Sequence, residues 1–326
     1  MNASQHSACL KAMVEAAWGH NASLAPSHSA FVLLEDSTDT ALGDILTQAK
    51  ADKRWHPLPD PYFAQEPEAA PVFIAWPIEA EAAQQMLHDV LDLALKQAPM
   101  RTGQQRLGAL LWSQQPLNAV LDHLMVLAAL RSPEGDSVLY RFQDPRVLQW
   151  LWPSLSDAQK LQWLGPLQHW WAVAQPFGPW PHEDEDDWSG QWWQKASQPQ
   201  GPQAPQPAPH TLLNAKQWQL AHTAASANRV WNTLHTMSFE AGLQPDASTL
   251  KRWLNEAVEL GLDVSRASGY ALARAYVAAR GQGATWDQPQ NQGWVQAALQ
   301  RCAQHPDELF DNVYLVLRSE AGRPLF

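Results

Sequence analysis

The stretch SVLYRFQDPRVLQWLW, residues 137–152, contains the clearest change from one kind of element to another in this sequence. Its first six residues are rich in apolar and β-prone side chains, which predicts a short strand over 137–142. Asp144 is a good helix N-cap, and Pro145 suits the first helical position because its missing N–H has no partner there. The stretch therefore predicts a strand that leads directly into a helix over 145–152.

The same alternation of strand and helix extends outward from this stretch. Upstream, compact apolar runs are each followed by a helical pattern, with strands expected at 30–34, 72–76 and 107–112 and helices at 39–50, 79–96 and 116–130. Downstream, Ser156 opens a capping box before a helix that ends near Trp163, and a fifth strand is expected over 167–174. A short amphipathic helix is expected over 5–19. These patterns predict a mixed α/β lobe of about five strands with flanking helices, without specifying strand order, and an antiparallel edge strand is compatible with them.

Composition changes sharply after this lobe. Residues 182–187 are an acidic block, HEDEDD, and residues 198–209 are a Pro/Gln-rich run typical of an extended linker. Five helical patterns joined by short loops follow, at 214–237, 246–260, 265–280, 292–302 and 307–318. We expect three regions: an α/β domain at 1–180, an acidic, Trp-containing and Pro/Gln-rich linker at 181–210, and a small all-helical lobe at 211–326.

Charge and cysteine content narrow the function classes. The net charge of -11 argues against nucleic acid or an anionic membrane as the main partner. Cys9 and Cys302 are the only cysteines, which fits a reducing cytosol. The N-terminus has no basic n-region, and the most apolar later stretch, 119–130, is interrupted by charge and too short to span a bilayer. We expect a soluble cytoplasmic protein.

The usual catalytic motifs are absent. The sequence contains no Walker A motif, no dinucleotide-binding glycine pattern, no nucleophile elbow and no H-E-x-x-H. His182 beside the acidic block offers carboxylate oxygens to a divalent cation, but such a contiguous run lacks the spaced ligands of a calcium loop. We therefore expect no enzyme activity, no cofactor and no metal site.

Two groups of residues are candidate partner contacts. Arg141, Asp144 and Arg146 form the charged cluster R-F-Q-D-P-R at the expected strand–helix junction, where α/β proteins often bind ligands. The alternative is that Asp144 caps the helix and pairs with an arginine. On the helical lobe the candidates are Trp253, Tyr270, Arg274 and Trp286, with Arg274 one turn from Tyr270 on the same helical face. Each of these residues also has a purely structural interpretation.

Tryptophan is unusually frequent, with 18 in 326 residues. Trp150, Trp152 and Trp163 fall in helical patterns and are expected in the core. Six more crowd the segment before the linker: Trp170, Trp171, Trp180, Trp188, Trp192 and Trp193. Such a cluster indicates a sugar-stacking surface, a protein-docking strip or a flap packed over the core.

Several of these motifs together resemble a known family. Residues 137–155, SVLYRFQDPRVLQWLWPSL, followed by GPLQHW at 165–170, are similar to the type VI secretion adaptor proteins, also called effector chaperones or Tap/TEC proteins. FVLLED at 31–36 matches the family's opening strand, and LLWS at 110–113 with Pro116 and LDHL at 121–124 resembles its third strand and helix. The resemblance covers roughly residues 28–175. It departs at Gln143, where an aromatic residue is common, and in the long acidic and Pro/Gln-rich insert.

The resemblance implies a cytoplasmic, non-catalytic adaptor. Its partners would be a type VI secretion effector, in some cases of PAAR or Rhs type, and the VgrG spike on which the effector is mounted, with no nucleic acid or membrane partner. The alternatives are a Trp-rich carbohydrate-binding module and, third, a cryptic enzyme.

Overall fold

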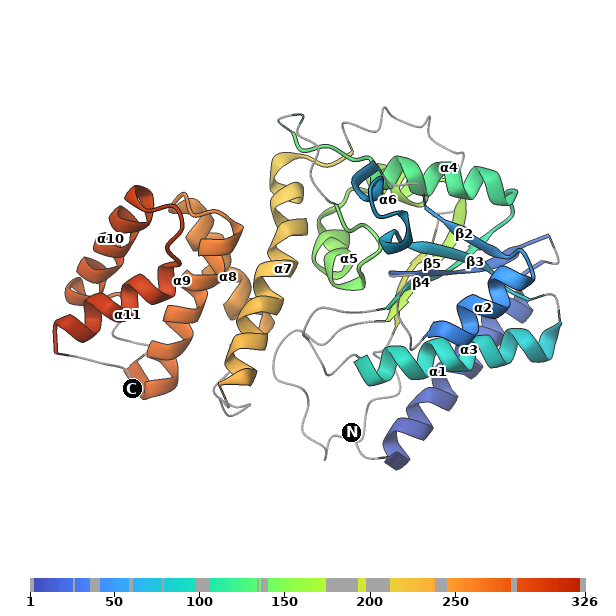
Figure 1. Ribbon diagram of the computed structural model, residues 1–326, viewed down its shortest axis with the longest axis horizontal. Helices are drawn as coiled ribbons and strands as arrows, with labels where there is room; N and C mark the ends of the chain where they lie inside the picture. Colours follow the sequence, from blue (N-terminus) through green and yellow to red (C-terminus); the bar gives the residue numbers. More distant parts are fainter. Residues whose placement is uncertain are drawn as a thin grey trace. The chain divides into compact units, whose positions relative to one another are not determined.

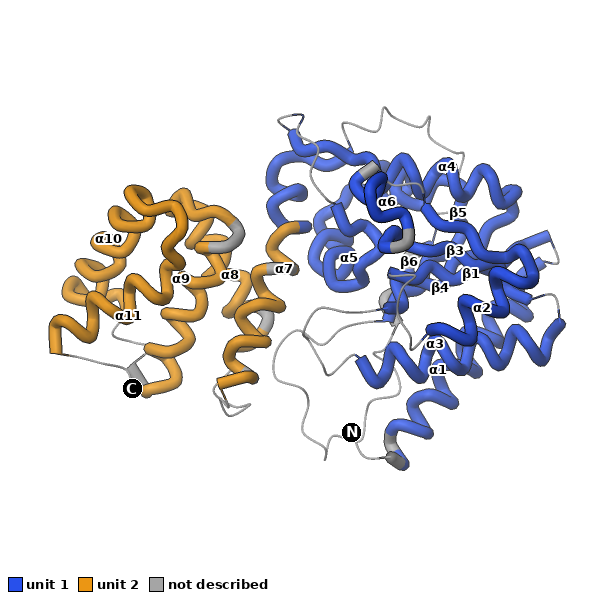
Figure 2. Tube along the Cα trace, viewed as in Figure 1, with its two compact units in different colours: residues 1–175, 182–221 blue, residues 176–181, 222–326 orange. Residues whose placement is uncertain are grey.

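The computed structural model describes two compact units. The described residues are 3–25, 27–35, 42–58, 61–77, 79–97, 106–133, 135, 140–173, 193–197, 212–237, 245–282 and 286–322. Those within 1–175 and 182–221 form the first unit, and those within 176–181 and 222–326 form the second (Figure 2). The division falls inside helix α7 (Ala215–Thr236).

The first unit is built on a six-stranded sheet in its described part. The strands are β1 (Ser29–Leu34), β2 (Trp55–Pro57), β3 (Val72–Ala75), β4 (Leu107–Ser113), β5 (Leu167–Val173) and β6 (Trp193–Ser197), in the order β2-β3-β1-β4-β5-β6. Every pairing between them is antiparallel. The central strand β1 places Leu33 opposite Phe73 of β3 and Val32 opposite Leu110 of β4. The sequence patterns left the strand order open, and the structure places β1 between β3 and β4.

Helices cover both faces of this sheet. They are α1 (Ala3–Ser23), α2 (Gly43–Ala51), α3 (Ala80–Gln97), α4 (Leu117–Ala128), α5 (Pro145–Leu151) and α6 (Asp157–Leu164). Figure 1 shows α1, α2 and α3 on one side of the sheet and α4, α5 and α6 on the other. Because both faces are covered, all seven residues of β4 are buried, which explains its unbroken apolar run.

Most of the expected elements are confirmed, and the differences have local causes. The strand expected over 137–142 is wrong for Tyr140–Phe142, and residues 137–139 lie outside the described part. The Phe142 N–H donates to the carbonyl of Tyr140 at 2.9 Å and the Asp144 N–H to that of Arg141 at 3.0 Å, so the backbone turns instead of extending. Within the expected linker, residues 193–197 form β6, and β2 was also missed because it is only three residues long.

The second unit is helical throughout its described part, as expected. It contains the later turns of α7 together with α8 (Ala247–Glu259), α9 (Val264–Val277), α10 (Pro289–Gln304) and α11 (Phe310–Glu320). Asp246 and Asp263 cap α8 and α9 by accepting hydrogen bonds from Thr249 N (2.7 Å) and Arg266 N (2.9 Å). In neither unit is a described helix long and apolar enough to cross a membrane.

Candidate functional site

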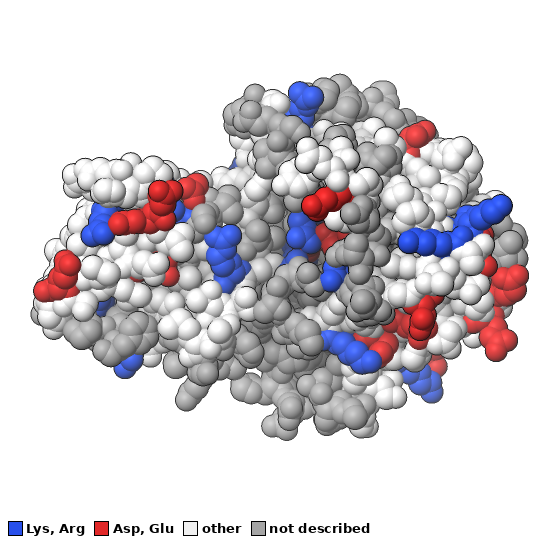
Figure 3. Space-filling model, in the orientation of Figure 1, with Lys and Arg blue, Asp and Glu red and all other residues white. Residues whose placement is uncertain are grey.

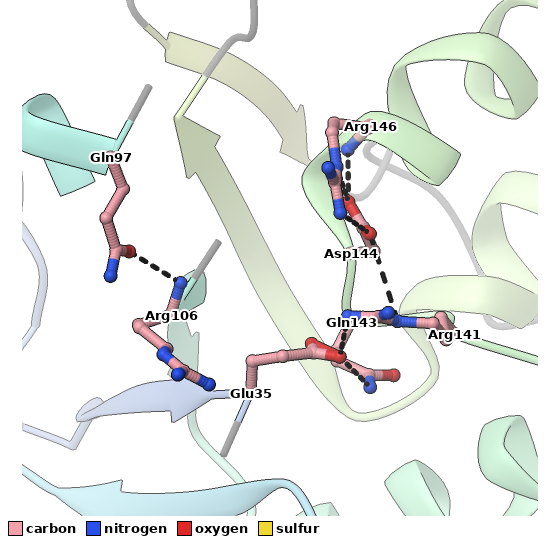
Figure 4. Close-up of polar contacts among 7 residues, drawn as sticks. All are labelled: Glu35, Gln97, Arg106, Arg141, Gln143, Asp144 and Arg146. Carbon is pink, nitrogen blue, oxygen red and sulfur yellow. Dashed lines mark hydrogen bonds and ion pairs between the residues drawn. The ribbon is translucent and has the colours of Figure 1, made fainter. Parts of the chain in front are cut away.

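The first candidate cluster is organised by the N-terminus of α5. Asp144 has an extended backbone, and its Oδ1 accepts from Arg146 N at 2.9 Å, so it is the N-cap that the sequence predicts. The Arg146 guanidinium then folds back on the same carboxylate, with Nε 2.8 Å from Oδ1 and Nη2 2.6 Å from Oδ2. Both side chains are buried, so this is a two-point charge pair shielded from water (Figure 4).

Arg141 connects this pair to the end of the central strand. Its Nη2 lies 2.6 Å from Oε1 of Glu35, the residue after β1, and its Nε lies 3.9 Å from Oδ2 of Asp144. The Gln143 amide donates to the same Glu35 oxygen at 3.0 Å. The Arg141 side chain is 39% exposed and that of Glu35 10%, so Arg141 covers a buried carboxylate at the surface. We call Glu35, Arg141, Gln143, Asp144 and Arg146 the charged network (Figure 4).

The pKa values of the two carboxylates in the network are shifted in opposite directions. Burial would raise the pKa of Asp144, but the charge of Arg146 and its hydrogen bonds outweigh burial and hold that pKa below its ordinary value of 3.8. Burial raises the pKa of Glu35 above its ordinary value of 4.5, since Arg141 and Gln143 only partly compensate. Asp144 is therefore firmly ionised, whereas Glu35 is the group in this network whose charge the fold disfavours.

A close backbone approach fixes the position of the network. A Cβ on Gly108 of β4 would lie 2.8 Å from the carbonyl oxygen of Gln143, closer than real Cβ atoms come, and 3.2 Å from that of Leu33, which is also tight. Glycine at 108 therefore lets the turn at 140–143 lie directly against β4. Sequence reasoning missed Gly108, Glu35 and Gln143 as members of this site. Gln143 itself was the available signal, since it stands where an aromatic residue is common in the family. Its amide can donate a hydrogen bond to a carboxylate, as it does to Glu35.

A second pair of motifs also meets in the fold. Gly165 has a φ of +53°, and a Cβ there would lie 2.3 Å from the ring of His123. Nε2 of that buried histidine lies 2.7 Å from the carbonyl oxygen of Trp163. The G-P motif at 165–166 and the LDHL motif at 121–124, separated by 40 residues, are thus parts of one packing arrangement.

The second candidate cluster lies in the helical unit around Arg274. Its guanidinium carbon is 5.3 Å from the ring centroids of Trp253 and Trp286 and 6.0 Å from that of Tyr270. Arg274 Nη1 also pairs with Oε2 of Glu256, and Tyr270 OH lies 3.5 Å from the same oxygen. Burial lowers the pKa of Arg274 to about 10, which leaves it charged at neutral pH. We call these five residues the arginine cage.

All seven predicted site residues therefore fall into two groups. Arg141, Asp144 and Arg146 belong to the charged network, and Trp253, Tyr270, Arg274 and Trp286 belong to the arginine cage. Asp144 also caps its helix and pairs with Arg146, as the structural interpretation expects. Whether either group contacts a partner stays a prediction.

The described tryptophans belong mainly to the interior. Trp150, Trp163, Trp170 and Trp171 are buried and Trp152 is half-buried. No tryptophan is among the exposed large apolar side chains of the described residues. The side chains of the other four in the crowded segment, at 180, 188, 192 and 193, lie outside what the structure describes, as does the acidic block at 182–187. Elsewhere in the described chain, no group of three or more His, Cys, Asp or Glu residues is arranged to hold a metal ion.

Three motifs that meet in the first unit carry the resemblance to the type VI secretion effector chaperones: R-F-x-D-P-R, G-P and the buried opening strand. Comparison with family models agrees: residues 30–162 match the family described as Domain of unknown function (DUF4123). This domain is the marker of the Tap/TEC effector chaperones, which are adaptors and not an enzyme family. The resemblance drawn from the motifs is thereby confirmed. No curated protein and no solved structure matches the chain.

Proposed function

We propose that this protein is a cytoplasmic adaptor that binds a type VI secretion effector and helps load it onto the VgrG spike. The observation that carries the proposal is the family match over 30–162, which is associated with effector adaptors and includes the whole charged network. An effector of PAAR or Rhs type is the cargo that the family resemblance suggests.

Differences in exposure support different roles for the residues of the two clusters. Asp144 and Arg146 are buried, so their role is to hold the turn at 140–143, whereas Arg141 offers surface to a partner. In the arginine cage the three rings are buried, and Glu256, 34% exposed, is the surface group that Arg274 orients. We propose Arg141 and Glu256 as contact residues and the others as their supports, because interface hot spots need rigid, pre-positioned groups.

The carbohydrate-binding alternative has little support. Sugar stacking needs an aromatic face open to solvent. None of the described tryptophans is among the exposed large apolar side chains, so they give this alternative no support.

Co-purification tests the proposal directly. The tagged protein is expressed with VgrG and a PAAR- or Rhs-type effector encoded beside it, and the eluate is separated by size exclusion. A stable complex that contains the effector is the expected result. Elution of this protein alone beside intact, soluble effector and VgrG would contradict the adaptor assignment.

A variant then tests the contact surface. The double change Glu35→Gln and Arg141→Gln removes both charges of one ion pair without leaving a buried charge unpaired. We expect a loss of effector affinity of about tenfold or more with an unchanged far-UV circular dichroism spectrum. Lys11→Gln is the control, since that side chain is 76% exposed on α1. Full binding by the double variant would assign Arg141 to the scaffold.

A further inference from the structure

Four basic side chains gather where α1, β5 and β6 meet. They are His20 at the end of α1, His28 just before β1, His169 on β5 and Lys195 on β6. We call them the histidine patch. His28 and His169 are half-exposed and Lys195 is exposed, so the patch opens to solvent. It involves neither the charged network nor the arginine cage.

Trp171 on β5 contacts two of the four residues of the patch, His20 and Lys195. The His20 ring stacks on it with centroids 4.4 Å apart, and Lys195 Nζ lies 3.9 Å from the same centroid. His20 also meets the His169 ring edge-on at 4.5 Å. On the outer side, His169 Nδ1 lies 2.9 Å from Ser197 Oγ of β6. α1 also contacts the sheet away from Lys195, since Trp112 Nε1 donates to Asn21 Oδ1 at 3.1 Å.

The pKa values of two histidines in the patch are lowered by burial and by neighbouring basic groups. Burial and then the charges of His169, Lys195 and His28 lower the pKa of His20 to about 4, and burial and the charge of His28 lower that of His169. No carboxylate contributes to either shift among the described residues. Within the described part of a chain of net charge -11, this is a local concentration of basic groups whose pKa values no carboxylate raises.

We propose that the histidine patch binds a run of acidic residues in a partner protein. Carboxylates placed over Lys195, His169 and His28 would supply the missing negative charge and would favour protonation of the histidines. Charge complementarity selects the occupant. A nucleic acid is disfavoured because the chain's net charge repels a long polyanion, and because His20 and Lys195 already contact the ring of Trp171, which leaves less of it for base stacking. This inference does not depend on the type VI assignment.

The first test measures binding of an octaglutamate peptide by isothermal titration calorimetry at low salt. Because binding favours the protonated histidines, it takes up protons, and affinity should rise by about threefold or more between about pH 7.5 and about pH 5.5. Titrations in two buffers of different ionisation enthalpy measure the proton uptake. Affinity that does not change with pH in this range would overturn the proposal, as would tighter binding of a DNA oligonucleotide with the same number of charges.

Variants locate the binding site. Lys195→Gln should weaken peptide binding by about tenfold, and His169→Gln should reduce its pH dependence. Lys11→Gln, a lysine exposed on α1, should leave both unchanged. Equal effects of Lys11→Gln and Lys195→Gln would show attraction by overall charge alone and would overturn the proposal.

The chain's own acidic block, 182–187, is the competing occupant. A variant with these carboxylates changed to amides should bind the octaglutamate peptide at least as tightly as the natural chain. If only this variant binds the peptide, the natural surface is occupied by the chain itself and the proposal of an external partner falls.

Discussion

The two units each hold an arginine away from water, and they do so by opposite means. Arg146 in the first unit is fixed by one carboxylate through two short hydrogen bonds, and that carboxylate lies only two residues earlier in the chain. Arg274 in the second unit is surrounded by three aromatic rings and shares a half-exposed carboxylate. The first arrangement places the charge directly against one buried carboxylate. The second distributes its stabilisation over several weak contacts, so it should tolerate change better.

The largest expected effect comes from removing that buried carboxylate. Asp144→Ala leaves Arg146 buried without its carboxylate and also removes the cap of α5, so we expect a loss of about 3–5 kcal/mol in the free energy of unfolding. Urea denaturation measures it. Asp157→Ala, whose side chain is 91% exposed beside Lys160, is the control and should change nothing measurable. A loss below about 1 kcal/mol for Asp144→Ala would mean that the charge of Arg146 is stabilised without Asp144.

The second prediction compares backbone constraint in the two units. Gly165→Ala places a Cβ 2.3 Å from the buried His123 ring and strains a φ of +53°, so we expect about 2–4 kcal/mol of destabilisation in thermal or urea unfolding. Gly261→Ala at the end of α8 has a φ of +79° but nothing within 4 Å of its added Cβ. Only backbone strain of about 1 kcal/mol should remain there. Equal losses would show that the contact with His123 is easily relieved.

The third prediction concerns the arginine cage. Arg274→Met keeps the apolar stem between the rings and removes the charge, and Glu256 can turn to water because it is half-exposed. We expect a loss of only about 1–2 kcal/mol, measured by urea denaturation followed by tryptophan fluorescence. Arg252→Met, on an exposed position of the same helix as Glu256, should have no such effect. A loss as large as that of Asp144→Ala would break the contrast between the two units.

The smallest expected effect is a pH dependence within the charged network. The folded-state pKa of Glu35 is raised, so folding becomes more favourable as the pH falls through that pKa towards 4.5. Asp144, with a lowered pKa, contributes stability above pH 3.8 that is lost only as the pH falls through its folded-state value. Glu35→Gln should therefore remove a gain of less than about 1 kcal/mol between neutral pH and about pH 5, seen by urea denaturation at both pH values. An unchanged gain in the variant would assign it to another group.

The contrast between the two arginines also explains what the sequence could predict. Asp144 as a cap and the capping box of Ser156 and Gln159 were predictable, because each is decided by residues within one helical turn. The same holds for the apolar runs that became β1, β3, β4 and β5. The aromatic partners of Arg274 were named individually, but their assembly into a cage depends on how separate helices pack.

Long-range contacts decided the elements that sequence reasoning missed. Tyr140–Phe142 is β-prone, yet the backbone turns there because Gly108 admits it against β4 and Glu35 receives Arg141 and Gln143. The strand β6 has little apolar character of its own and forms by pairing with β5, with His169 opposite Ser197 and Trp171 opposite Lys195. No local pattern encodes either result.

The strand order has a consequence for how the chain is made. Once β3 has paired with β1 and β2, each later strand adds at the outer edge of the sheet, β4 on β1, β5 on β4 and β6 on β5. This spatial order is also the order in which a ribosome releases these strands. No later strand has to open an existing ladder, and each new edge is covered by the next strand to emerge. At synthesis rates of roughly 5–20 residues per second, each edge would wait only seconds for its partner, which limits the time for strand-to-strand aggregation during synthesis.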